Sequence, residues 1–329
     1  MIELTPSHLH FSLEQLQSIA RVVLASKPEP ILAWRLMHQV LDIPAHYPEM
    51  AVAKAAALDS NWVHQLEGAQ LPDGSFGRFH SQDTKHKTIF RTSEEAIDRA
   101  FALGLEASHP ILTHMTGYIQ RALQGQVHIT DPDEKNQAWP LIIRLILAGR
   151  LAHIEPSDRL IAPFWQYLQE VTRYAFRSGC YRLEDEVDAY QQLSGVHVPK
   201  GFLESQHALW ILSCQAMDSQ LENKLIDWVW NKPDGIRYVR APLTAPQPRR
   251  IGYWLRSVNI LSRFAAWREM SPLTLNRLWE SRHEQVWWDF GKQSGRCAEF
   301  PLSHNWRQHI NRKIDYTTSM LAVLRKCFD

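Results

Sequence analysis

The sequence predicts an all-α fold of about six helical hairpins, on the strength of three observations. Apolar residues recur at three- and four-residue spacing along most of the chain. Helix-capping patterns and prolines suited to first turns precede many of these runs. Glycine-bearing polar loops recur at Gly74, Gly125, Gly179, Gly235 and Gly291, with gaps of 51, 54, 56 and 56 residues by subtraction. A period of about 54 residues holds two helices and two connections.

Individual helix starts follow from capping chemistry. Ser12-x-x-Gln15 and Thr92-x-x-Glu95 have the form of capping boxes, in which side chains satisfy the free N–H groups of a first turn. Five prolines fit first-turn positions, where the missing N–H costs nothing: Pro30, Pro110, Pro132, Pro156 and Pro272. We expect about thirteen helices in all.

Two segments depart from the helical pattern. Residues 236–239 look strand-like but are too short to found a sheet. Residues 241–250 carry three prolines and no periodicity, which predicts an ordered flap.

Bulk composition excludes some partners. The chain has 36 basic and 35 acidic residues and a net charge of +1, so no nucleic-acid partner is expected. Its first residues lack the pattern of a signal peptide, and apolar runs such as 141–148 are too short for an integral membrane segment. The four cysteines, Cys180, Cys214, Cys297 and Cys327, are widely spaced, which predicts reduced thiols and a cytoplasmic protein.

The segment from Gln70 to Phe76 reads Gln-Leu-Pro-Asp-Gly-Ser-Phe. It resembles the loop repeated in terpenoid cyclases, including squalene-hopene cyclase, and in the β subunits of protein prenyltransferases. Phe76 stands where those families usually have Trp. The resemblance implies an α/α toroid, or barrel, of six hairpins around a central cavity, with residues 1–329 forming a single domain. The same Pro-Asp-Gly sequence is also an ordinary turn.

The segment Asp131-Pro132-Asp133-Glu134 is similar to the Asp-x-Asp-Asp acid motif of class II terpenoid cyclases. The resemblance implies that Asp133 is the catalytic acid and that Asp131 and Glu134 tune it, because adjacent carboxylates raise one pKa. Glu134 replaces the last Asp of that motif. The alternative is a plain helix start, with Asp131 as the cap and Glu134 returning the hydrogen bond.

Polar and basic residues lie in or beside the glycine-bearing loops, which the toroid would gather on one rim. The candidate substrate-binding residues are His80, Lys85, Arg91, Tyr181, Arg237, Tyr238, Trp306, Arg307 and Arg312. Arginine forks suit phosphate groups, so a diphosphate head group is expected, with Mg²⁺ as a possible companion. The alternatives are a solvated basic face and a structural network of Arg312 with Asp315.

No metal site is predicted. The prenyltransferase zinc site uses Asp, Cys and His, and Asp289, Cys297, His304 and His309 supply those types. The tight Asp-x-Cys spacing of that family is absent, and no paired CxxC or HExxH occurs.

The resemblance implies an isoprenoid-type cyclase or transferase, of lyase or isomerase chemistry, with no cofactor beyond the possible Mg²⁺. Its partner would be an apolar or amphiphilic small molecule, such as a prenyl diphosphate, in a central cavity. Four tryptophans are candidates to stabilise cationic intermediates: Trp139, Trp165, Trp210 and Trp306. Two alternatives stay open: a non-catalytic toroid that binds a hydrophobic ligand or protein, and a carbohydrate-active toroid that uses Glu184 and Asp185.

Overall fold

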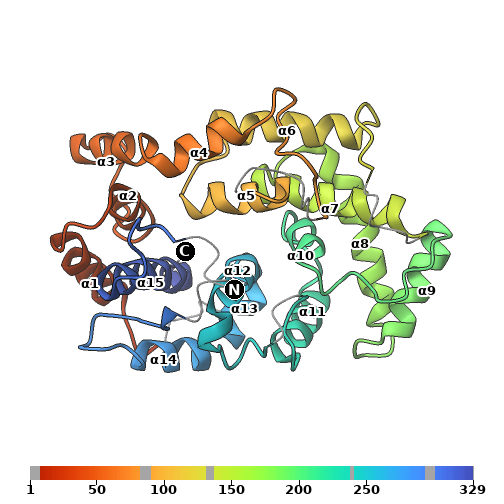
Figure 1. Ribbon diagram of the computed structural model, residues 1–329. Coiled ribbons are helices and arrows are strands. Elements are labelled where there is room, and N and C mark those ends of the chain that lie inside the picture. Colours follow the sequence, from red (N-terminus) through yellow and green to blue (C-terminus); the bar gives the residue numbers. More distant parts are fainter. Residues whose placement is uncertain (1–7, 82–89, 131–136, 238–240, 293–300, 329) are drawn as a thin grey trace. The chain divides into compact units, whose positions relative to one another are not determined.

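A computed structural model describes residues 8–81, 90–130, 137–237, 241–292 and 301–328 (Figure 1). Within these residues the chain forms fifteen α-helices, and the only strand-like pairing is the isolated bridge between His283 and Trp287. The all-α prediction is therefore confirmed. No helix in this part of the chain has both the length and the apolar character needed to cross a membrane.

The chain divides into two compact units. Unit 1 comprises Met1–Val63 and Trp230–Asp329, and unit 2 comprises His64–Val229. The divisions fall inside α4 (Asn61–Ala69) and α11 (Ser219–Asn231). The toroid and the single domain of residues 1–329 concern the whole chain, so both stay predictions.

Unit 1 is organised around its last long helix, α15 (His309–Arg325), which packs against α1, α2 and α12. Met320, Leu321 and Leu324 of α15 are fully buried. The other helices of this unit are α1 (Leu13–Ala25), α2 (Pro30–Gln39), α3 (Pro48–Leu58), α12 (Ile251–Leu261), α13 (Ala265–Met270) and α14 (Pro272–Glu280).

Unit 2 is organised around α7 (Trp139–Ile154), which packs against α6 (Pro110–Leu123) and α10 (Gln206–Leu212). Every residue of α7 from Leu145 to Ile154 is buried. A helix that is apolar on all sides belongs in a core, so this placement follows from the sequence. The remaining helices are α5 (Ser93–Ala102), α8 (Ala162–Ala175) and α9 (Leu183–Ser194).

Most of the expected helix starts are confirmed. Ser12 and Gln15 form a complete capping box. Thr92 caps α5 by accepting from the Glu95 N–H at 3.1 Å, but the Glu95 carboxylate accepts from the Arg91 N–H instead of returning to Thr92. Three of the five prolines begin helices as predicted: Pro30, Pro110 and Pro272.

The two remaining prolines and the flap of residues 241–250 have separate outcomes. Pro156 lies in a turn after α7, so its prediction is wrong, because Asp158 caps the following 3-10 turn by accepting from the Leu160 N–H at 2.8 Å. Pro132 lies outside the described residues. In the flap, Leu243 is fully buried and its carbonyl accepts from Trp254 Nε1 at 2.8 Å, so this segment is tied to α12.

The five loop glycines share a backbone conformation. Gly74, Gly125, Gly179, Gly235 and Gly291 have φ between 67° and 96°, a region that favours glycine. Gly74 is also confined by its neighbours, because a Cβ there would lie 2.4 Å from the His114 carbonyl oxygen. The prediction that these five glycines lie at one end of a toroid concerns both units, so it stays a prediction.

The Gln70–Phe76 loop joins three helices. Gln70 Nε2 donates to the carbonyls of Gly74 and Ile111, both at 2.9 Å. The Phe76 N–H donates to Ser93 Oγ at 2.9 Å, and the Phe76 ring, 1% exposed, meets Phe90 edge-on. The loop therefore ties the end of α4 to the starts of α5 and α6.

Replacing Phe76 with Ala should lower the free energy of unfolding by roughly 3–5 kcal/mol, because a buried aromatic ring is lost. Chemical denaturation measures this, with Leu71→Ala in the same loop as the control, since Leu71 is 40% exposed. A loss below about 1 kcal/mol for Phe76→Ala would show that the ring does not hold the loop in place.

Candidate functional site

A buried arginine lies at the centre of unit 2. Arg150 is 1% exposed in the apolar helix α7, and its charge must be compensated there. Its Nε donates to Glu94 Oε1 at 2.8 Å, and its terminal nitrogens lie 2.6 and 3.3 Å from the two oxygens of Asp98. Glu94 and Asp98 are four residues apart on α5, so they share one helix face.

Two histidines complete the arrangement around Glu94. His80 Nδ1 lies 2.5 Å from Glu94 Oε2, and His207 Nε2 lies 3.2 Å from Glu94 Oε1. We call His80, Glu94, Asp98, Arg150 and His207 the Glu94 cluster. Their side chains are 2–8% exposed except for that of His80, at 21%, so His80 is the member of the cluster that is most exposed to solvent.

The backbone places each histidine beside Glu94. The Ser93 and Glu94 N–H groups donate to the carbonyls of Arg78 and Phe79, which holds the loop carrying His80 against the start of α5. His207 lies in the first turn of α10, which Ser205 caps. Gly149 allows α10 to approach α7 closely, because a Cβ at this position would lie 2.6 Å from His207 Cβ.

The charges of the cluster stabilise one another. Burial by itself would raise the pKa of Glu94, but the charges of Arg150 and His207 and the hydrogen bond with His80 outweigh it, so this pKa lies well below its usual range. Burial would lower the pKa of Arg150, but Asp98 and Glu94 raise it above its usual value. Glu94 is therefore ionised at neutral pH and is no proton donor.

Aromatic rings adjoin the cluster. The ring centroid of Trp139, at the start of α7, is 5.9 Å from that of His80. The Phe202 ring stacks on His207 at 6.3 Å. A substrate that reached His80 would therefore meet an indole as well as an imidazole.

The cluster offers two kinds of chemistry. One nitrogen of His80, one of His207 and one oxygen of Glu94 all lie within 4.8 Å of one another, which is close enough to hold a metal ion. Without a metal, His80 and Glu94 form an imidazole–carboxylate pair, an arrangement used in proton transfer.

The structure brings one of the predicted site residues, His80, into this cluster. Several others lie outside the described residues: Asp131, Asp133, Glu134, Lys85 and Tyr238. The acid motif and its role in catalysis therefore remain predictions.

Two further predicted residues of unit 2 lie elsewhere. Arg91 is exposed just before α5. The Tyr181 hydroxyl donates to Glu186 Oε2 at 2.6 Å, and its ring stacks on Trp228 with centroids 3.7 Å apart. Glu186 also accepts from the Phe202 and Leu203 N–H groups, so Tyr181 belongs to a buried packing arrangement.

The predicted residues of unit 1 have varied surroundings. Arg307 is exposed, whereas Arg237 is half-buried in a turn. Trp306 is buried, with its ring 6.0 Å from that of Tyr316. Arg312 is buried and donates to both oxygens of Asp289, each at 2.7 Å. The partner of Arg312 is thus Asp289, while Asp315 accepts from Ser303 and from the Leu302 N–H.

The four candidate tryptophans also differ in their burial and contacts. Trp139 is half-buried beside His80, which places its ring against the Glu94 cluster. Trp165 is buried and donates to the Leu212 carbonyl, and Trp210 stacks on His153 at 4.1 Å. Trp139 is therefore the tryptophan of this set that the observed contacts favour for a role beside His80.

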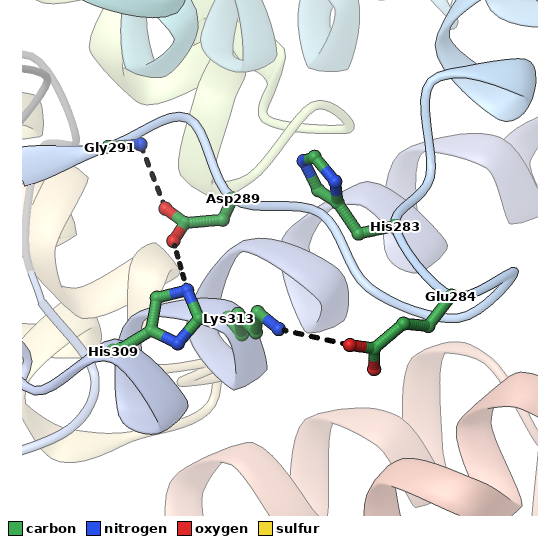
Figure 2. Close-up of a pocket in the computed structure, with 6 residues that line it drawn as sticks. All are labelled: His283, Glu284, Asp289, Gly291, His309 and Lys313. Atoms are coloured by element: carbon green, nitrogen blue, oxygen red, sulfur yellow. Dashed lines mark hydrogen bonds and ion pairs between the residues drawn. The ribbon is translucent and has the colours of Figure 1, made fainter.

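Unit 1 has a pocket of about 480 Å³ beside Asp289, lined by His283, Glu284, Asp289, Gly291, His309 and Lys313 (Figure 2). Asp289 Oδ2 lies 3.2 Å from His309 Nε2, and Asp289 Oδ1 accepts from the Gly291 N–H. Burial would raise the pKa of Asp289, but the hydrogen bonds from Arg312 and Gly291 lower it overall. Cys297, which shares its residue type with a ligand of the prenyltransferase zinc site, lies outside the described residues.

Sequence reasoning missed four of the five cluster residues: Glu94, Asp98, Arg150 and His207. Two local signals were present. Arg150 interrupts the apolar run of residues 145–152, and Glu94 and Asp98 stand four residues apart after a helix cap. Glu94 and Arg150 are 56 residues apart, so nothing in the sequence indicated that these two features pair with each other.

Comparisons of the chain with protein-family models, with curated proteins and with solved structures give no match.

Replacing Gly149 with Ala should destabilise the protein by about 1–3 kcal/mol, because the added methyl group forces α10 away from α7. Gly68→Ala in α4 is the matched control, since a Cβ there meets nothing within 4 Å. Helix propensity alone would make both changes stabilising by up to about 1 kcal/mol. Equal stabilisation of both variants in thermal unfolding would contradict the close approach of the two helices.

Replacing Arg150 with Met should cost about 3–5 kcal/mol of stability, because Glu94 and Asp98 would remain buried without their cation. Arg173→Met is the control, since Arg173 pairs with Glu170 at an exposed site, where about 0–1 kcal/mol is expected. Urea unfolding compares the two, and similar small losses would mean that the cluster does not depend on Arg150.

Proposed function

We propose that the chain is an isoprenoid-type transferase that acts on an amphiphilic anion, such as a prenyl diphosphate, with the Glu94 cluster at its reaction centre. The proposal includes the α/α toroid and the cytoplasmic location. The observation that carries it is a buried, charge-coupled carboxylate flanked by two imidazoles, of which His80 is partly exposed. Strongly coupled titratable groups of this kind are concentrated at functional sites.

The Gln70–Phe76 loop links the cluster to the family resemblance. Its glutamine and aromatic residue tie successive helices together, as the resemblance implies. His80 lies four residues after this loop. The segment on which the resemblance rests is therefore followed directly by a residue of the Glu94 cluster. Trp139 adds an apolar surface beside His80 that suits a hydrocarbon group.

The chemistry of the cluster favours transfer over cyclisation that begins with protonation. Protonating an alkene requires a strong acid, and Glu94 is ionised because Arg150 and the histidines hold its pKa low. A neutral imidazole can accept a proton from an attacking nucleophile. With Nδ1 on Glu94, any proton exchange between His80 and a substrate would run through Nε2.

Binding of farnesyl diphosphate, compared with neutral farnesol by calorimetry, tests the proposal. We expect the diphosphate to bind more tightly, because the candidate arginines favour an anionic head group. Arg91→Ala and Arg307→Ala should be compared, since the first lies in unit 2 and the second in unit 1. The variant that removes a direct contact should lose roughly 10- to 150-fold in affinity, as expected for about 1.5–3 kcal/mol.

Lys224→Ala serves as a control for a general loss of positive charge. Equal affinity for farnesyl diphosphate and farnesol, or binding of neither, would remove the diphosphate proposal.

One observation favours a second candidate, the non-catalytic toroid that binds a hydrophobic ligand. Every oxygen of Glu94 already has a partner among Arg150, His80 and His207, so the cluster could be a purely structural network. Binding of farnesol and farnesyl diphosphate with equal affinity would support this candidate.

A further inference from the structure

We propose that His80, Glu94 and His207 bind one divalent first-row metal ion such as Zn²⁺, with His80 Nδ1, His207 Nε2 and Glu94 Oε2 as ligands. This inference deepens the proposed function because it rests on the same cluster. It also departs from the sequence, which predicted no metal.

The ligand atoms have suitable spacing. In a tetrahedral site with metal–ligand bonds of about 2.0–2.1 Å, ligand atoms lie roughly 3.4 Å apart. Glu94 Oε2 lies 2.5 Å from His80 Nδ1, and His207 Nε2 lies 3.2 Å from the other oxygen, Oε1. One nitrogen of each histidine and one oxygen of Glu94 lie within 4.8 Å of one another. Small rotations of the His80 and Glu94 side chains would open the space that an ion needs.

The protein holds the three ligands from three different elements. Glu94 is in the first turn of α5, His207 is in the first turn of α10, and His80 is in a loop fixed to α5 by backbone hydrogen bonds. Arg150 binds Glu94 Oε1 and thereby directs Oε2 towards His80. Groups that orient a metal ligand in this way are a regular part of metal sites.

Arg150 does not repel a cation from this site, because Asp98 neutralises it. Glu94, Asp98 and Arg150 together carry a formal charge of −1. A divalent ion with two neutral imidazoles would bring the cluster to +1. The remaining positive charge would attract an anionic fourth ligand, such as a phosphate oxygen, on the side where His80 is 21% exposed.

The ligand types select the metal. Two imidazoles and one carboxylate suit zinc, cobalt or iron, whereas Mg²⁺ prefers an all-oxygen octahedron. Three protein ligands leave a coordination position open for water or substrate. The residues also differ from the Asp, Cys and His of the prenyltransferase zinc site.

The Asp289 group in unit 1 contains the same residue types, but an arginine engages both oxygens of its carboxylate. Both oxygens of Asp289 accept from Arg312, and Oδ1 also accepts from the Gly291 N–H. Arg150, by contrast, contacts Glu94 through Oε1 and leaves Oε2 to His80. This difference assigns the metal to Glu94.

Cobalt titration of the untagged full-length chain, stripped of metal with a chelator, tests the site. We expect one Co²⁺ per chain with visible d–d absorption, displaced by an equal amount of Zn²⁺ and unaffected by excess Mg²⁺. A thiolate-to-cobalt charge-transfer band would assign the ion to cysteines and overturn the proposal, as would the absence of stoichiometric binding.

Two single variants locate the ion. His80→Gln and His207→Gln should each weaken Co²⁺ binding by at least about 100-fold, more than the loss of an orienting residue costs. His64→Gln is the matched control, because His64 pairs with Glu67 at an exposed site. His80 is in a loop and partly exposed, so its variant should fold, which circular dichroism verifies. Undiminished binding by folded His80→Gln would overturn the proposal.

Metal binding and substrate binding can fail separately. The Co²⁺ titration contains no substrate, and farnesyl diphosphate binding can be measured with and without Zn²⁺. One Co²⁺ at His80 without any binding of the diphosphate would retain the metal site and remove the proposed function. Tight diphosphate binding in the presence of chelator, together with no Co²⁺ binding, would retain the proposed function and remove the metal site.

Discussion

The charge of Arg150 is the constraint on which unit 2 depends. A guanidinium in the middle of an apolar helix must find carboxylates, and α5 supplies two of them on one face. The pairing ties α5 to α7, while Gly149 allows α10 to approach the same turn of α7 closely. The ion pairs that hold these helices together therefore also set the position of Glu94 between two imidazoles.

Such a cluster contributes less to stability than its number of contacts suggests. Removing several charges from water is costly, and a well-packed apolar core of similar volume is often at least as stable. The unequal exposure of its members is informative here: Arg150 and His207 are enclosed, while His80 meets solvent. The partial exposure of His80 is one reason to look for a ligand at this residue.

The success of the sequence predictions depended on how local the determining contacts are. The Ser12 capping box, the first-turn position of Pro30 and the loop at Gly74 are decided within a few residues, and all three were predicted. The prediction for Pro156 was wrong because Asp158, two residues later, caps the next turn. The Glu94 cluster joins four segments spread over more than 120 residues, and no local pattern specifies that pairing. His80 was selected only because it follows a recognisable loop.

The two carboxylate groups of the chain show why residue types alone do not define a site. Asp289 and Glu94 each have an arginine and a histidine as partners. Arg312 donates a hydrogen bond to each oxygen of Asp289, so both oxygens of that carboxylate are bound by the same arginine. Arg150 divides its donors between Glu94 and Asp98, so one oxygen of Glu94 faces an imidazole that solvent can reach. Asp98 therefore decides how Glu94 is held, because it takes up the terminal donors of Arg150 and leaves Glu94 Oε2 to His80.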